Sequence, residues 1–154
     1  MKKMILTSIF VAVLVTLVIS LNDGVPDTAF ASDSYYVSTE GSDSGPGTLE
    51  KPWKTIQRAA DAAAPGSTVY IKSGTYYERV DVRVSGMSAE KPTVFRNYEN
   101  DKAVIDGSKS SPEEQADLIR ISDCSFVELI GLEITNNVTD KNGFLLTGIG
   151  VFGA

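Results

Sequence analysis

The sequence predicts an all-β fold, a parallel β-solenoid that begins directly after one short helix. The stretch Ala62–Val84 contains the end of a helical segment, a short strand, a tight turn and a second alternating strand. Short strands then recur at nearly even spacing along the rest of the chain, and no further helical pattern interrupts them. Repeated small strand units without helices are typical of a solenoid, in which each coil packs only on its neighbours.

A targeting segment precedes this domain. Lys2 and Lys3 give the chain a basic start, Ile5–Leu21 is almost continuously apolar, and residues 29–31 read Ala-Phe-Ala, the small-x-small pattern that signal peptidase accepts. The apolar run is slightly short for a membrane span of about 20 residues. Cleavage after Ala31 is therefore favoured over an uncleaved anchor. We expect a signal peptide at residues 1–31 and a secreted domain at residues 32–154.

Composition excludes several classes of function. The chain has 20 acidic and 14 basic residues, a net charge of −6 and no basic cluster, which argues against nucleic acid and anionic membranes as partners. It has no histidine, so histidine-based triads and zinc sites are excluded within it. The single cysteine, Cys124, cannot form an internal disulfide. We interpret it as a small buried hydrophobic residue, with a reactive thiol as the less favoured alternative.

A polar loop and a helix lead into the first coil. Glu40–Thr48 is rich in Gly, Pro, Ser and Asp, as loops are. Asp43 is interpreted as an Asx-turn residue; a calcium-ligand role is less favoured because the loop lacks the pattern of an EF-hand. Pro52–Ala64 predicts a helix, since apolar residues recur on one face and Pro-Gly follows. We expect Trp53 in the core rather than on the surface as a platform for sugars.

The remaining strands are short runs in which apolar and polar residues alternate. They are Tyr35–Ser38, Thr68–Lys72, Val80–Val84, Thr93–Arg96, Ala103–Ile105, Leu118–Ser122, Phe126–Ile130, Leu132–Thr135 and Gly148–Phe152. Two series of strand centres suggest which strands occupy equivalent places in successive coils. The first is Ile71, Phe95 and Ile119, at 24-residue intervals, and the second is Val82, Val104 and Val127, at intervals of 22 and 23. Ile149 would begin a further coil after a longer excursion at residues 136–147.

An antiparallel sandwich is the alternative all-β interpretation, and it needs hairpin turns. Asp106-Gly107 and Asn142-Gly143 are dipeptides of the required kind. The first, however, is followed by a long polar run, and no strand of matching length directly follows the second. The solenoid is therefore preferred.

The two ends of the predicted solenoid differ. The helix at residues 52–64 lies just before the first coil, where it can cover the apolar interior that the first coil would otherwise expose. The last seven residues, GIGVFGA, are apolar and stop inside a strand-like run. We therefore expect further coils to lie beyond Ala154 in a longer protein. The isolated domain should then expose apolar surface, and aggregate or bind a hydrophobic dye, rather than melt as a cooperative monomer.

These segments resemble a known family. YYVS, GSDSGPGT, KPWKTIQRAADAA, PGSTVYI and SGTYYE occur in fixed order over Tyr35–Glu78, and Lys91–Ser108 and Phe126–Asn137 look like the coils that follow. Together they resemble the N-terminal part of secreted right-handed parallel β-helix proteins, above all the pectate-lyase-like proteins of polysaccharide lyase family 9. Chondroitinase-B-like and alginate-lyase-like proteins share much of this signature.

The resemblance implies β-elimination on uronic-acid polysaccharides. In family-9 lyases a calcium ion held by several aspartates neutralises the uronate carboxylate, and a lysine removes the C5 proton. A cation stabilises the enolate-like charge that develops, and a lysine acts as a base near neutrality only with a lowered pKa. The sequence before Ala154 contains no aspartate cluster of the family's pattern. No catalytic, cofactor-binding or metal-binding residue is therefore assigned to this chain.

Several polar residues are candidates for other roles. Glu128 and Glu133 are predicted to point outward beside a bend, as solvated surface rather than as parts of a groove or ion site. Lys72, Arg83 and Arg96 are also predicted to point outward, where contact with a polyanion is the less favoured alternative to plain surface charge. Residues 136–137, Asn-Asn, fall at a predicted coil corner, where a structural role is preferred. Asn137-Val138-Thr139 is a glycosylation sequon, which matters only in a eukaryotic source.

The sequence therefore predicts a signal peptide, a capping helix and the first three to four coils of an exported β-helix protein. The longer protein is expected to be a monomeric, calcium-dependent lyase that acts on an acidic, pectate-like polysaccharide. The rival from another class is a non-catalytic surface or carbohydrate-binding β-helix; a hydrolase or epimerase on the same scaffold is a third alternative. Fold alone does not choose among them.

Signal cleavage gives the first testable expectation. The exported protein should begin at Ser32, because Ala29 and Ala31 present the small side chains that signal peptidase requires. The intact mass of protein recovered from the medium of an expressing cell measures this directly. Ala31→Gln should leave the segment attached, whereas Thr28→Gln, outside the small-x-small pattern, should not. Recovery of wild-type protein that still carries residues 1–31 would contradict the expectation.

Overall fold

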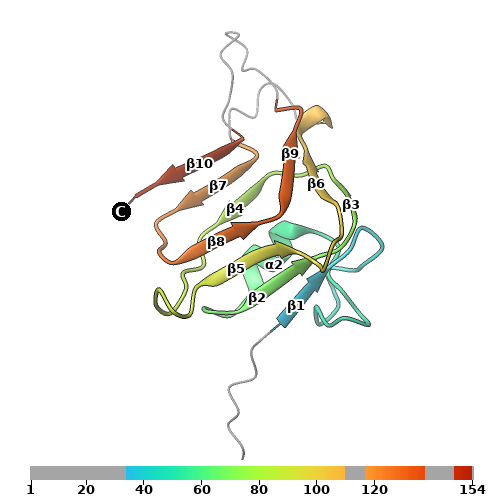
Figure 1. The fold of residues 1–154 in the computed structure, drawn as a ribbon. Helices are drawn as coiled ribbons and strands as arrows, with labels where there is room; N and C mark the ends of the chain where they lie inside the picture. Colours follow the sequence, from blue (N-terminus) through green and yellow to red (C-terminus); the bar gives the residue numbers. More distant parts are fainter. Residues whose placement is uncertain (1–33, 110–116, 138–147, 154) are drawn as a thin grey trace, which may run out of the picture. The chain divides into compact units, whose positions relative to one another are not determined.

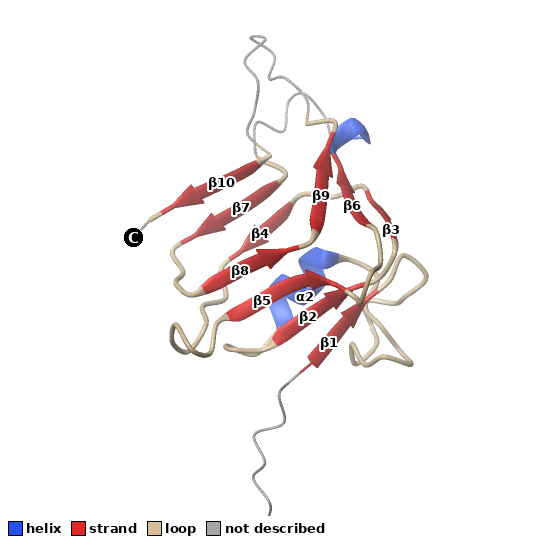
Figure 2. Ribbon diagram, viewed as in Figure 1, coloured by secondary structure: helices blue, strands red, loops and turns tan. Residues whose placement is uncertain are grey.

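The computed structural model describes residues 34–109, 117–137 and 148–153. Three parallel sheets wind around a common interior, and the strands of the three sheets alternate along the chain (Figures 1 and 2). The strands are β1 Ser34–Val37, β2 Thr68–Ile71, β3 Gly74–Tyr76, β4 Val80–Val82, β5 Thr93–Asn97, β6 Ala103–Asp106, β7 Ile119–Ser122, β8 Val127–Ile130, β9 Leu132–Thr135 and β10 Ile149–Phe152. The helices are α2 Ile56–Ala62 and the 3₁₀ turn η2 Gly107–Lys109.

The strand order confirms the solenoid and shows three strands in each coil. Sheet A has the order β1-β2-β5-β8, sheet B has β3-β6-β9, and sheet C has β10-β7-β4. Every pairing is parallel. Each complete coil therefore takes one strand from each sheet in turn, and three complete coils follow β1. The antiparallel sandwich is excluded, because a sandwich needs hairpins and the described strands pair in parallel, each with a strand of a neighbouring coil.

The predicted equivalence of strand centres was right for two pairs and wrong for the others. β5 stacks on β2, and Ile149 stacks on Ile119, as expected. Val69 pairs with Phe95, and Phe95 pairs with Leu129, whereas Ile119 belongs to sheet C and pairs with Val80 and Ile149. Separations between stacked residues range from 26 (Val69 to Phe95) to 39 (Val80 to Ile119). Grouping the strands by their nearly constant spacing in the sequence placed strands of different sheets in the same series. Connections between strands vary in length because they lie outside the stacked core, so the period of the chain is irregular although the register of the sheets is not.

One strand was not predicted. The turn expected at residues 73–74 leads directly into β3, which pairs in parallel with β6. Its sequence, Gly-Thr-Tyr, is too short to show alternation, and only Tyr76 points into the core, where it is 3% exposed. The predicted strand at residues 80–84 is present but ends at Val82. Three short strands thus replace the two that the sequence suggested in this coil.

The helix is shorter than predicted. Thr55 is its N-cap, with its Oγ1 accepting from the Arg58 N–H at 3.1 Å, and the chain is extended again at Ala63. Residues 52–54 are not helical because Trp53 forms a parallel bridge with Val37. Its N–H donates to the Tyr36 carbonyl at 2.9 Å. Edge pairing to β1 therefore competes successfully with the helical preference of this segment, and the helix starts only after the bridge.

The helix closes the first coil, as the predicted cap should. Ile56, Ala59 and Ala60 are buried, and they join one continuous core with the inward residues of the strands. Small alanines let the helix axis approach the sheet closely. The buried apolar core comprises Val37, Trp53, Ile56, Ala59, Ala60, Ala63, Val69, Ile71, Tyr76, Val80, Val82, Phe95, Ala103, Ile105, Leu118 and Ile119.

Trp53 is a core residue, as predicted, and the preceding loop is shaped around it. Its indole is 3% exposed, stacks on Tyr35 at 4.9 Å between centroids and donates from Nε1 to the Gly45 carbonyl at 2.9 Å. Gly47 adopts a positive φ of 77°, and a Cβ there would lie 2.6 Å from Trp53 Cε2. Only glycine fits this position, because it satisfies both the backbone conformation and the close approach of the ring.

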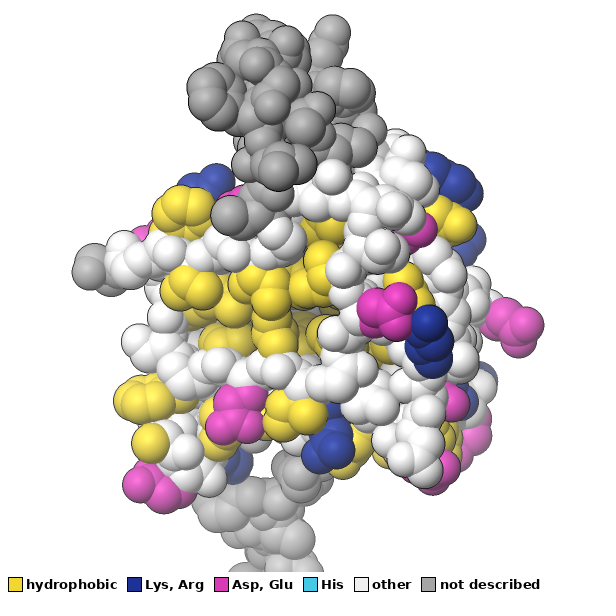
Figure 3. Space-filling view, turned by 45° about the horizontal axis from the view of Figure 1, so that its top comes forward, with side chains coloured by type: hydrophobic (Ala, Val, Ile, Leu, Met, Phe, Trp, Pro, Cys, Tyr) yellow, Lys and Arg dark blue, Asp and Glu magenta, His cyan; other side chains and the backbone are white. Residues whose placement is uncertain are grey.

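The last described coil leaves aliphatic side chains uncovered. Ile149 and Val151 are in register with the buried Ile119 and the partly buried Ile121, so they continue the inward rows of sheet C, but they are 43% and 72% exposed. Val127, Leu129, Leu132 and Ile134 of the same coil are only partly buried. Figure 3 looks into this end and shows hydrophobic side chains gathered in a hollow inside the ring of the last strands.

Among the described residues, no helix is long and apolar enough to cross a membrane.

This open end predicts dye binding by the folded domain. We expect a fluorescent hydrophobic dye to bind wild-type protein, and Val151→Ser combined with Ile149→Ser to reduce the signal, because both are exposed apolar side chains of the last described strand. Met87→Ser is a matched control, since Met87 is 59% exposed in the loop between β4 and β5. An equal loss of fluorescence in the control, or no dye binding by the wild type, would contradict a specific apolar end.

Candidate functional site

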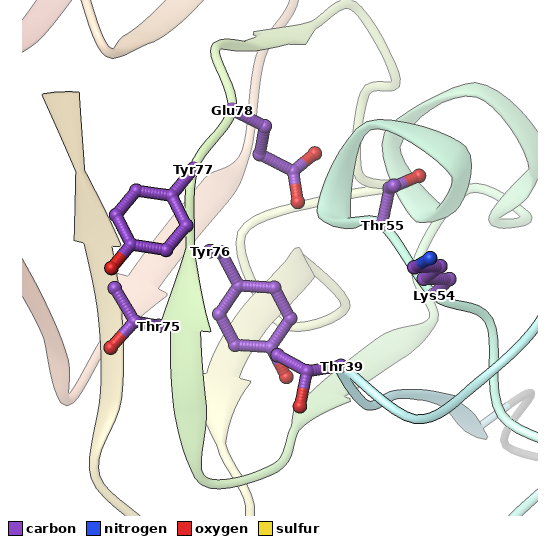
Figure 4. Close-up of a pocket in the computed structure, with 7 residues that line it drawn as sticks. All are labelled: Thr39, Lys54, Thr55, Thr75, Tyr76, Tyr77 and Glu78. Atoms are coloured by element: carbon purple, nitrogen blue, oxygen red, sulfur yellow. The ribbon is translucent and has the colours of Figure 1, made fainter. Parts of the chain in front are cut away.

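A small open pocket lies beside the first turn of α2 (Figure 4). Its volume is about 230 Å³. Thr39 comes from the loop after β1, Lys54 and Thr55 come from the entry to the helix, and a continuous segment, residues 75–78, supplies the opposite wall. Because these three segments are far apart in sequence, the pocket marks the place where the cap, β1 and the first coil meet.

Glu78 is the titratable side chain at the centre of this junction. Its Oε1 and Oε2 accept from the Ile56 and Gln57 backbone N–H groups, both at 2.9 Å. These donors belong to the first turn of α2 and have no partner within the helix. Burial raises the pKa of Glu78, and the two backbone hydrogen bonds oppose that rise. Glu78 therefore fixes the helix to the first coil, and both carboxylate oxygens are already engaged.

The tyrosines of the pocket also have structural partners. Tyr76 is buried, and its hydroxyl donates to the Lys72 carbonyl at 2.8 Å. Burial, with the negative charges of Glu78 and Asp101 adding to it, raises the pKa of Tyr76 well above the ordinary value. Tyr77 is 48% exposed, and the Lys109 ammonium lies 3.6 Å from its ring centroid. Tyr76 therefore stays protonated near neutrality, and Tyr77 packs against a cation.

A second carboxylate, Asp43, holds the entry to the helix. Its Oδ1 accepts from the Lys54 and Thr55 N–H groups at 2.8 and 2.9 Å, and its Oδ2 accepts from Thr55 Oγ1 at 3.0 Å. Burial raises the pKa of Asp43, but the hydrogen bonds from Thr55 and Lys54 outweigh that effect and hold it below the ordinary value. The interpretation of Asp43 as an Asx-turn residue was wrong about the groups that its carboxylate binds. The carboxylate bonds backbone eleven and twelve residues away rather than its own loop, because the loop folds back onto the helix entry.

The other acidic residues weighed from sequence lie apart from this junction. Glu128 and Glu133 are exposed, and Glu133 pairs with Lys102 at 3.0 Å. Asn136 has a positive φ of 51° and donates from Nδ2 to Asp106 Oδ2 at 3.1 Å. Asn136 thus has the structural corner role that was preferred for it. The threonine of the sequon lies outside the described residues.

The basic residues and the cysteine are placed as follows. Arg83 is exposed and pairs with Asp81 on sheet C, whereas Lys72 and Arg96 lie half-buried along sheet A.

Cys124 is less buried than predicted, with its thiol donating to the Val82 carbonyl at 3.6 Å. Burial and then the charge of Asp123 raise the pKa of the Cys124 thiol. A raised thiol pKa lowers the thiolate fraction, so the geometry favours the unreactive alternative.

A calcium site requires several oxygen ligands at one point. Within residues 34–109, 117–137 and 148–153, no three acidic, histidine or cysteine side chains gather closely enough to hold a metal ion. Asp43, Glu78 and Asp106 each accept hydrogen bonds from nearby backbone N–H groups. The described residues therefore do not bring together the acidic cluster on which the expected calcium centre would depend.

Comparison with known proteins decides the family. The model of the Pel9A-like, right-handed β-helix region matches residues 35–152. The chain belongs to this family. The match confirms the right-handed parallel β-helix expected from sequence, because it spans the loop before the helix and all three coils.

Two related proteins and one solved structure are similar to this chain over part of their own length. The chain is 42% identical over 125 residues to the uncharacterized protein YwoF of Bacillus subtilis, covering 80% of this chain and 26% of YwoF. It is 35% identical over 113 residues to the pectate lyase PEL9 of Emericella nidulans, covering 66% of this chain and 27% of PEL9. Among solved structures, a rhamnogalacturonan lyase aligns with a TM-score of 0.56 at 29% identity, covering 66% of this chain and 28% of the lyase. The chain thus spans about a quarter of the length of each.

The Asp43 contacts predict a pH-dependent stability. Asp43→Ala should lower the unfolding free energy near pH 7 by about 1–3 kcal/mol, because backbone donors lose a charged acceptor. The pKa of Asp43 is depressed in the folded state, so its contribution is full above the unfolded value of 3.8 and is lost as pH falls through the folded pKa. Denaturant titration from pH 7 to pH 2.5 measures this.

The difference between wild type and Asp43→Ala should therefore shrink toward the acid end. Glu50→Ala is the matched control, because Glu50 is an exposed acid in the same loop. A difference that stays constant with pH, or that Glu50→Ala reproduces, would contradict the assigned role of Asp43.

Proposed function

We propose that this chain forms the cap and first coils of an exported polysaccharide-acting β-helix protein. The longer protein is a calcium-dependent lyase that cleaves uronic-acid polysaccharides, pectate-like in chemistry, by β-elimination. The observation that carries the proposal is the 35% identity to a pectate lyase over 113 residues. The structural likeness to a rhamnogalacturonan lyase supports it independently.

In this proposal, this chain provides the cap and further coils provide the catalytic residues. The described carboxylates that bond the helix entry hold the cap in place, and none joins a group that could bind a metal. The calcium ligands and the base that takes the C5 proton would therefore be supplied by coils beyond Ala154. The coverage of about a quarter of PEL9 supports this division. What this chain supplies is a closed N-terminal end and a fixed register on which those coils stack.

A non-catalytic carbohydrate-binding β-helix is the second candidate. It rests on the fold, since a right-handed β-helix offers a long surface to a glycan whether or not it breaks bonds. Both candidates share an exported β-helix and a polysaccharide partner, with a monomer as the expected state. They differ only in whether bonds are broken.

Activity with and without calcium distinguishes the two. The full-length protein should release unsaturated uronate products, which absorb in the ultraviolet, from polygalacturonate in the presence of calcium. A chelator should abolish the signal, and added calcium should restore it. The 154-residue chain alone should produce none. Activity that persists with chelator would contradict the calcium mechanism, and a full-length protein that binds the polymer without cleaving it would favour the second candidate.

A further inference from the structure

The outer side of sheet A carries an ordered row of large polar side chains. In the parallel register, Tyr36 of β1 lies beside Tyr70 of β2, and Tyr70 lies beside Arg96 of β5. Their strand neighbours Val37 and Phe95 are buried, whereas these three side chains are half-buried. Alternation along the strands therefore places one of these side chains from each of three successive strands on the same outer surface.

A third tyrosine and a second cation complete the group. Tyr36 and Tyr70 stack at 5.3 Å between ring centroids, and Tyr98 meets both edge-on at 5.8 and 5.9 Å. The Lys72 ammonium lies 5.8 Å from the Tyr98 ring. We call Tyr36, Tyr70, Lys72, Arg96 and Tyr98 the tyrosine face. Stacking explains why the rings associate, but it does not require two cations beside them.

The polar atoms of this face are short of partners within the described part of the chain. The Arg96 Nε is buried and donates to no acceptor there, and no described carboxylate lies within ion-pair distance of this guanidinium. The terminal nitrogens of Arg96 are not among the buried atoms, so a ligand that offers a carboxylate oxygen can reach them and gain a charge-assisted hydrogen bond.

Nearby acidic residues are engaged with other groups. Glu99 interacts with the Tyr98 hydroxyl, which raises the pKa of that phenol. Asp101 accepts from the Ser73 N–H at 2.9 Å. Glu128 is exposed on β8, where it pairs in register with Val94 rather than with Arg96. The positive charges of Lys72 and Arg96 are therefore not cancelled by a direct ion pair in the described structure.

We propose that the tyrosine face is an accessory binding site for an acidic polysaccharide that runs across the strands of sheet A. Adjacent strands are about 4.8 Å apart, close to the length of one sugar unit, so successive sugars would meet successive coils. Tyrosine edges and hydroxyls contact the sugar rings and their hydroxyls, and Arg96 with Lys72 binds uronate carboxylates. The site holds the polymer and has no part in bond cleavage. The choice of a uronate polymer rests on the proposed function.

Affinity electrophoresis of the 154-residue chain tests the site. Polygalacturonate in the gel should retard the wild-type chain, and a neutral galactan should not. Arg96→Gln should weaken binding roughly tenfold, the loss expected when a charge-assisted hydrogen bond disappears. Arg83→Gln is the matched control, because Arg83 is an exposed arginine directly after β4, away from sheet A. It should bind like the wild type.

Two further variants separate binding from folding. Tyr70→Ala should weaken binding, and Tyr70→Phe should retain the ring stack and the fold while losing the hydroxyl contact. Far-ultraviolet circular dichroism checks that each variant is folded. An unretarded wild-type chain, or equal losses for Arg83→Gln and Arg96→Gln, would overturn the site. Polymer binding without lyase activity in the full-length protein would defeat the lyase and leave the site standing. Lyase activity without binding by this chain would do the reverse.

Discussion

In-register stacking of inward side chains is the constraint on which this fold depends. Val69, Phe95 and Leu129 lie one above another in sheet A, as Val80, Ile119 and Ile149 do in sheet C. Each side chain is covered only by the coils before and after its own. Each added coil therefore buries apolar area of the coil before it. The coil at each end of the stack leaves apolar side chains that another element must cover.

The N-terminal end meets this requirement with a helix held by carboxylates. Alanines on α2 allow close packing over the first coil, and Glu78 and Asp43 bond backbone donors at the helix entry. The polar contacts and the apolar packing thus fix the same element from two sides. At the other end, the last described coil presents partly uncovered aliphatic side chains. The outer faces of the sheets are free of this constraint, so a row such as the tyrosine face can differ in chemistry from the core it covers.

Alternation and turn chemistry were enough to predict most strands, the cap and the buried Trp53. Local patterns failed where a partner was distant. The helix was predicted to begin at Pro52, but pairing of Trp53 with Val37 keeps that segment extended. Asp43 was expected to bond its own loop, and instead bonds residues beyond Trp53. Glu78 gave no signal at all, because an acid after a strand looks like ordinary surface. The tyrosines of sheet A were visible as outward residues, but only the register brings their rings together.

The sequence by itself determined the class of fold, since apolar alternation in short strands indicates sheets with one buried side, and the weak hairpin signals favoured a solenoid over a sandwich. It also determined the place of the cap. Only the tertiary structure decided which strands stack, because the connections differ in length and the backbone hydrogen bonds that set the register join residues 26 to 39 positions apart. The same register decided which outward side chains become neighbours. Which residues form the core follows from the alternation of apolar residues along each strand. Which outward side chains lie side by side follows from the pairing of strands in successive coils.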